Sequence, residues 1–159
     1  SVLGADTPEQ MLTNAAVPGY NFDSAQGLTY HIDPTQPVGA RVQNLCHQGQ
    51  PVAQGDLFAV LTSSFRASGG GGFNMLDAAE VLVPDLCGLS DAVERYLTDH
   101  DTVHLPPAAW HLTSAQTVEA RLLTGPSAHA DVPDTARFLG QTDAGWDKWE
   151  VTIGPLPSD

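Results

Sequence analysis

Basic residues are scarce in this sequence of 159 residues. Six Lys and Arg stand against 19 Asp and Glu, and the formal net charge is −13 at pH 7. Contacts to nucleic-acid phosphates need clustered Lys and Arg, so the composition excludes a nucleic-acid polymer as partner. The acidity also disfavours docking on an anionic membrane. We interpret it as a solubility feature of an exported or salt-exposed protein.

Long hydrophobic runs and cysteines are also few. No apolar run approaches the roughly 18 residues of a membrane span. The first residues lack the basic-then-apolar pattern of a signal peptide, which leaves a mature exported protein possible. The two cysteines, Cys46 and Cys87, can form one disulfide or remain two thiols, and the sequence leaves both open.

Complete motifs for catalysis and phosphate binding are absent. The glycine run at 69–72 is followed by neither Lys-Ser nor Lys-Thr, and it does not fit Gly-x-Gly-x-x-Gly. There is no Gly-x-Ser-x-Gly elbow and no Cys-x-x-Cys pair. Asp99, His100, Asp101 and His104 form the densest polar cluster, but their spacing matches no closed zinc site, and we interpret them as a solvated loop. We therefore expect no catalytic residue, no metal site and no cofactor in this chain.

The segments that are present predict an α+β fold, with a mixed β-sheet flanked by helices. Apolar content is 42%, which fits one globular domain. Alternating or apolar patterns predict strands over 28–33, 41–45, 80–83, 118–124 and 148–153. Helices are predicted to begin at Thr7-Pro8 and to run from Ser90 to His100, and a helical turn is predicted over 134–139. The second helix is predicted to bury an apolar stripe in the core, formed by Ala92, Val93, Tyr96 and Leu97. Pro106 and Pro107 are predicted to mark a loop that carries Trp110.

One stretch, residues 56–77, organises the rest of the prediction. Residues 57–61 are apolar on both faces and only Thr62 interrupts the run, which predicts a central strand over 57–62 covered on each side. The strand leads into Phe65 and Arg66 and then into four glycines, which leave room for close approach of backbone to a ligand. Two interpretations follow. The stretch is either a turn after a core strand with Phe65 packed inside, or a floor for a flat ligand.

An ordered set of short motifs carries a family resemblance. In this order the motifs resemble the C-terminal domain of the 5′-nucleotidase family, and within it the branch of periplasmic or wall-anchored 2′,3′-cyclic-nucleotide 2′-phosphodiesterase/3′-nucleotidases. The resemblance covers residues 17–153 of a single domain spanning 1–159. The motifs are Tyr20-Asn-Phe-Asp23, Gly27-Leu-Thr-Tyr-His-Ile-Asp33, Thr35-Gln-Pro37, Arg41-Val-Gln-Asn-Leu45, Gly49-Gln-Pro51, Ser64-Phe-Arg-Ala-Ser-Gly-Gly70, Ala109-Trp-His-Leu112, Arg121-Leu-Leu-Thr-Gly-Pro-Ser127 and Phe138-Leu-Gly140.

The resemblance implies a division of labour between two domains. In the family, an N-terminal metallophosphoesterase domain holds two divalent metal ions and performs the hydrolysis, whereas the C-terminal domain binds the nucleoside. The metal-binding signatures of the catalytic domain are missing from this sequence. The resemblance therefore implies an N-terminally truncated nucleotide-specificity domain of an exported enzyme of nucleotide catabolism. It implies that this chain alone is inactive.

The resemblance also implies a substrate-binding site at Phe65, Arg66, Gly69, Gly70 and Gly71. In the family the base lies between two aromatic rings, and Phe65 matches one of them; a stacked base gains about 1–3 kcal/mol. The second ring has no counterpart in this chain. Gly71 stands where 5′-nucleotidases place an Asp that holds the ribose, and backbone N–H groups of the glycine run can substitute for it.

Two other functions stay open at this stage. One is a stand-alone interaction or scaffold domain, in which exposed strand edges pair with another protein. The other is a small independent hydrolase that uses the Asp99, His100 and His104 cluster. The base preference and the phosphate position that the parent enzyme cleaves are open as well.

Overall fold

The computed structural model describes residues 11–14, 16–17, 19–84, 86–104 and 106–155. The predicted start of the first helix, at Thr7 and Pro8, lies outside these described residues. The chain divides into two compact units, one formed by Ser1–Ala53 with Ala108–Asp159 and the other by Gln54–Pro107. The predicted α+β class is confirmed, with a mixed sheet and a few short helices.

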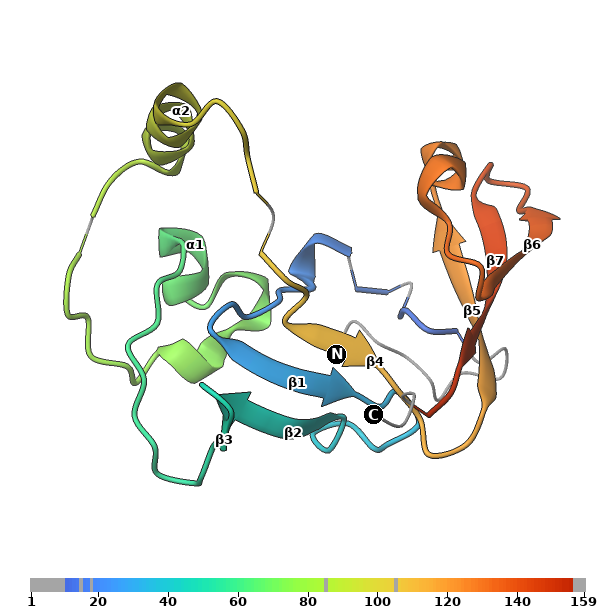
Figure 1. Ribbon diagram of the computed structural model, residues 1–159, viewed down its shortest axis with the longest axis horizontal. Coiled ribbons are helices and arrows are strands. Elements are labelled where there is room, and N and C mark those ends of the chain that lie inside the picture. The colour runs from blue at the N-terminus through green and yellow to red at the C-terminus, as the bar shows by residue number, and fades with distance from the viewer. Residues whose placement is uncertain (1–10, 15, 18, 85, 105, 156–159) are drawn as a thin grey trace. The chain divides into compact units, whose positions relative to one another are not determined.

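A four-stranded mixed sheet forms part of the first unit. Its order is β3-β2-β1-β4, and Figure 1 shows β2 and β4 on the two flanks of β1. β1 pairs antiparallel with β2 and parallel with β4. The strands are β1 (Leu28–Ile32), β2 (Val42–His47), β3 (Gln50–Pro51) and β4 (Trp110–Leu112), so the predictions for 28–33 and 41–45 are confirmed. Trp110 begins a strand rather than lying in a loop, because its backbone pairs with that of Tyr30.

A three-stranded antiparallel sheet, ordered β5-β7-β6, completes the strands of this unit. β5 (Val118–Thr124) and β7 (Asp147–Ile153) confirm two predicted strands. The helical turn predicted over 134–139 is wrong, because β6 (Ala136–Gln141) pairs along β7. The ring of Phe138 lies 5.1 Å from that of Trp149, and this cross-strand contact outweighs local helix propensity. Two 3-10 turns, η1 (Gly19–Asn21) and η4 (Pro126–Asp131), join the elements.

The apolar core of this unit lies where residue 12 meets the three-stranded sheet. Leu12, Ala120 and Ile153 are buried, and partly buried apolar side chains pack around them. Across the sheet, the buried carboxylate of Glu150 is ion-paired with Arg121 and Arg137 on the two neighbouring strands. Because each arginine is in register with Glu150, one carboxylate ties three strands together.

The Gln54–Pro107 unit is built of short helices. They are α1 (Ser64–Ala67), η2 (Gly70–Gly72), η3 (Asn74–Leu76) and α2 (Leu89–Asp99). The helix predicted over 90–100 is confirmed within one residue, but its N-cap is Gly88 rather than Ser90. The apolar stripe of this helix was predicted to lie in the core, and this is wrong because Val93 and Leu97 are 50% and 55% exposed. The stripe is an exposed apolar face.

The predicted strands over 57–62 and 80–83 are wrong. Both segments lie outside any strand, and Leu57 and Leu61 are 96% and 84% exposed. A central strand needs neighbours that pair with its backbone on both edges. Among the described residues of this unit no strand is present to do so. The apolar run therefore stays outside a sheet.

Asp33 closes the turn that follows β1. Its carboxylate accepts hydrogen bonds from the Thr35 backbone N–H at 2.9 Å, from the Thr35 hydroxyl at 2.5 Å and from the Gln36 amide at 3.1 Å. Burial opposes ionisation, but these hydrogen bonds outweigh it and lower the pKa of Asp33 below its ordinary value.

We expect Asp33→Asn to cost about 1–3 kcal/mol in the free energy of unfolding at pH 7. A lowered native pKa stabilises the fold above the ordinary carboxyl pKa, and this contribution disappears as the pH falls through the native value. The difference between wild type and variant should therefore shrink below about pH 4. Denaturant titrations followed by tryptophan fluorescence at pH 7 and pH 3 measure it, with exposed Asp143→Asn as control. An undiminished difference at pH 3 contradicts this assignment.

Candidate functional site

The candidate site begins at α1, a single helical turn capped by Ser63. The Ser63 hydroxyl accepts a hydrogen bond from the Arg66 backbone N–H at 3.3 Å, and the Ser68 hydroxyl donates to the Phe65 carbonyl at 3.0 Å. Successive helical residues point about 100° apart. As a result Phe65 is 58% exposed, whereas Arg66 is only 7% exposed. The Phe65 ring is therefore not enclosed in a core.

The glycine run folds into a tight turn next to this ring. Gly69, Gly71 and Gly72 have φ values of 81°, 71° and 84°, which side chains rarely adopt. Gly70 is required for another reason, which is space. A Cβ atom on Gly70 would clash with the Phe65 carbonyl oxygen and would lie 2.6 Å from the Cδ2 and Cε2 atoms of the Phe65 ring. The ring thus rests directly on the bare backbone of Gly70.

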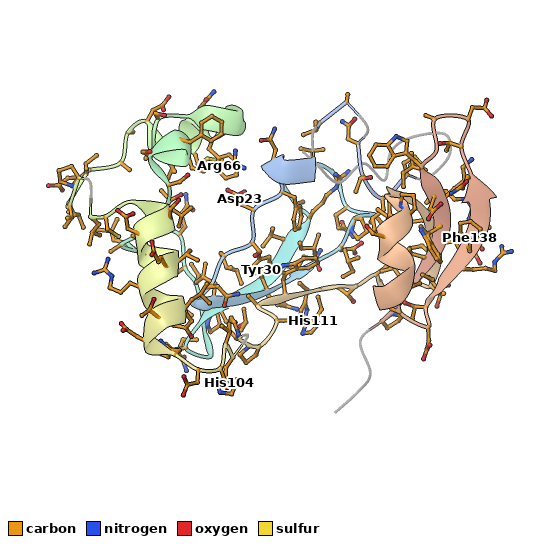
Figure 2. All side chains as sticks on the ribbon, turned by 90° about the horizontal axis from the view of Figure 1, so that it is seen from above. Asp23, Tyr30, Arg66, His104, His111 and Phe138 are labelled. Atoms are coloured by element: carbon orange, nitrogen blue, oxygen red, sulfur yellow. The ribbon has the colours of Figure 1, made fainter. Side chains whose placement is uncertain are left out.

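Arg66 connects the helix, the turn and a second ring. Its Nη1 donates to the Gly70 carbonyl at 3.1 Å, and its Cζ lies 4.4 Å from the centre of the Phe73 ring and 5.4 Å from that of Phe65. Both distances are within cation–π range. Figure 2 labels Arg66 in the segment that contains α1 and the glycine turn. The five predicted site residues, Phe65, Arg66, Gly69, Gly70 and Gly71, are therefore brought together in one local structure.

The sequence analysis missed two polar residues beside the turn. The side-chain oxygens of Asn74 and Asp77 each lie 3.3 Å from the point where a Cβ on Gly69 would stand, and both residues are exposed. The signal was their spacing, since residues three apart lie on one side of a 3-10 turn. These oxygens can accept hydrogen bonds from hydroxyl groups of a ligand.

In the polar cluster of Asp99, His100, Asp101 and His104, the His100 side chain contacts Tyr96. The ring of His100 stacks on Tyr96 at 4.1 Å, and its Nδ1 lies 2.9 Å from the Tyr96 carbonyl oxygen. Among the described residues, no group of three or more His, Cys, Asp or Glu is placed to hold a metal ion. Cys46 and Cys87 are free thiols. In the described part of the chain, no helix has the length and hydropathy needed to cross a membrane.

Residues 5–78 match the family model described as 5′-nucleotidase, C-terminal domain. The predicted resemblance to this domain is confirmed. The matched range includes all of the candidate site from Ser63 to Asp77.

Three curated relatives agree with the family match. A trifunctional nucleotide phosphoesterase protein of Bacillus subtilis is 30% identical over 152 residues, which is 84% of this chain and 10% of that protein. The 2′,3′-cyclic-nucleotide 2′-phosphodiesterase/3′-nucleotidase of Salmonella typhimurium is 31% identical over 80 residues, 43% of this chain and 12% of that protein. The protein of the same name from Haemophilus influenzae is 31% identical over 77 residues, 41% of this chain and 12% of that protein.

The chain thus spans about a tenth of the length of the curated relatives it matches. No solved structure matches it.

The close approach of Gly70 to the Phe65 ring predicts that a side chain at position 70 disturbs this ring. In Gly70→Ala the new methyl group must displace the ring or the turn, at about 1–3 kcal/mol. We expect large changes in the aromatic ¹H–¹³C resonances of Phe65. Gly72→Ala is the matched control, because a Cβ there meets open space and only its φ of 84° is unfavourable. Equal changes of the Phe65 resonances in both variants would show that the close approach at Gly70 is not required.

Proposed function

We propose that this chain is the nucleoside- or nucleotide-recognition domain of an exported, metal-dependent nucleotidase or 2′,3′-cyclic-nucleotide phosphodiesterase of nucleotide catabolism. The family match and the nucleotide-hydrolase names of the relatives support this class of parent protein. Hydrolysis would take place in a metallophosphoesterase domain with two divalent metal ions outside this chain. This chain by itself is then inactive.

The observation that carries the proposal is the exposed Phe65 ring seated on Gly70. With 58% of the residue exposed, the ring offers a rigid π surface that any nucleobase can cover. A side chain at position 70 would occupy the same space as the ring, so the turn and the stacking surface are built together.

The polar groups around the ring suit the sugar better than the phosphate. Asn74 and Asp77 place acceptor oxygens beside Gly69, where ribose hydroxyl groups can donate to them. Arg66 is the only basic residue between 63 and 77, and it is buried. The net charge of −13 also repels a phosphate. We therefore infer that the chain binds the nucleoside part, and that adenosine binds at least as well as 3′-AMP.

Binding by this chain alone should be weak, because Phe65 is the one ring of the family's two-ring clamp that the resemblance identifies here. We expect a Kd of about 10 mM for adenosine, since one stacking contact contributes about 1–3 kcal/mol whereas a Kd of 1 mM needs about 4 kcal/mol. Phe65→Ala should abolish saturable binding. An NMR chemical-shift titration with adenosine and 3′-AMP measures both.

Phe58→Ala is the matched control, because Phe58 is a partly exposed ring of the same unit, 44% accessible, outside the glycine turn. It should bind adenosine like wild type. If wild type shows no saturable shifts, nucleoside recognition by this chain is refuted. The interaction-domain alternative, which the exposed residues Leu57 and Leu61 favour, would then take its place.

A further inference from the structure

We propose that Arg66 is a positioning residue, which holds the Phe65 ring in place through Gly70 and Phe73 and does not contact the ligand phosphate. The inference rests on the proposed function, and it assigns Arg66 a different task from the substrate contact that the family resemblance implies. Three observations carry it: the burial of the guanidinium, its hydrogen bond to the glycine turn and its place between two rings.

Burial is the first step. A guanidinium is the most weakly hydrated protein cation, but it is still costly to bury without partners. Arg66 is 7% exposed, and within its own local structure it contacts the Gly70 carbonyl and the faces of Phe73 and Phe65. These contacts direct the cation into the turn. A ligand stacked on Phe65 would meet the ring and not the charge.

The second step is the connection from Arg66 to the ring. Nη1 fixes the orientation of the Gly70 carbonyl at 3.1 Å. The backbone of Gly70 in turn lies against the Cδ2 and Cε2 atoms of Phe65. Loss of the guanidinium releases this carbonyl, and the surface that supports the ring can then move. Arg66 thereby affects the position of the Phe65 ring indirectly, through the backbone of Gly70.

The third step concerns Phe73. The guanidinium carbon lies 4.4 Å from its ring centre, closer than to Phe65, and Phe73 is partly buried. The cation therefore occupies a face of Phe73. We assign Phe73 to the wall that anchors Arg66, rather than to a second base-stacking surface. A lysine at position 66 would retain the charge but lose the planar fork that reaches both the carbonyl and the rings.

The test measures two properties in each of four variants. The variants are Arg66→Met, Arg66→Lys, Phe73→Leu and Phe73→Tyr, with Arg95→Met on the exposed surface of α2 as the matched control. The first property is the position of the Phe65 aromatic resonances without ligand. The second is the affinity for adenosine and for 3′-AMP.

We expect Arg66→Met to shift the Phe65 resonances and to weaken both ligands by the same factor, about fivefold. Phe73→Leu should act likewise, and Arg66→Lys should be intermediate. Phe73→Tyr keeps the ring and should restore affinity to within about twofold of wild type. Arg95→Met should change neither property.

Other outcomes overturn the inference. A loss confined to 3′-AMP would place Arg66 on the phosphate, and unchanged Phe65 resonances in Arg66→Met would show that Arg66 does not hold the ring. If wild type binds neither ligand, the proposed function fails, but the ligand-free resonances still decide whether Arg66 positions Phe65. Arg66→Lys and Phe73→Tyr keep the test decisive where Arg66→Met fails to fold.

Discussion

The contact between the Phe65 ring and the bare backbone of Gly70 is the constraint on which the candidate site depends. Together with the Phe65 carbonyl oxygen, the ring leaves no room for a side chain at position 70, which explains why a glycine stands there without a positive φ. The neighbouring glycines serve a different purpose, because their φ values of 71° to 84° make the turn. Position 70 therefore requires glycine for lack of space, whereas positions 69, 71 and 72 require it for their positive φ.

The sequence predicted much of the larger unit. The strand over 28–33 is predictable because Tyr30 and Ile32 are buried and alternate with less buried residues, which leaves a period of two in the sequence. The prediction failed for 134–139, where pairing with β7 decides the conformation. The strand predicted over 57–62 is wrong as well, because an apolar segment forms a strand only where neighbouring strands pair with its backbone. A local apolar pattern therefore specifies neither the pairing partner of a segment nor its burial, since Leu57 and Leu61 are exposed.

For the site, the sequence and the family resemblance located the segment but not its internal contacts. Phe65 and the glycines were found because an aromatic residue and a glycine run are distinctive in sequence. Phe65 is exposed and Arg66 is buried because they are successive residues of α1, a single helical turn that Ser63 caps. Asn74 and Asp77 lie beside Gly69 because two 3-10 turns, η2 and η3, follow one another along this segment. Such contacts depend on turn geometry that residue types do not specify.

The central claim is that a nucleobase stacks on Phe65, and intermolecular NOE measurements test it most directly. In the complex with adenosine, the account predicts NOEs from adenine H2 or H8 to the ring protons of Phe65, with upfield shifts of the adenine protons. Saturable binding without any NOE to Phe65, or with NOEs only to rings outside the Gln54–Pro107 unit, would contradict the account.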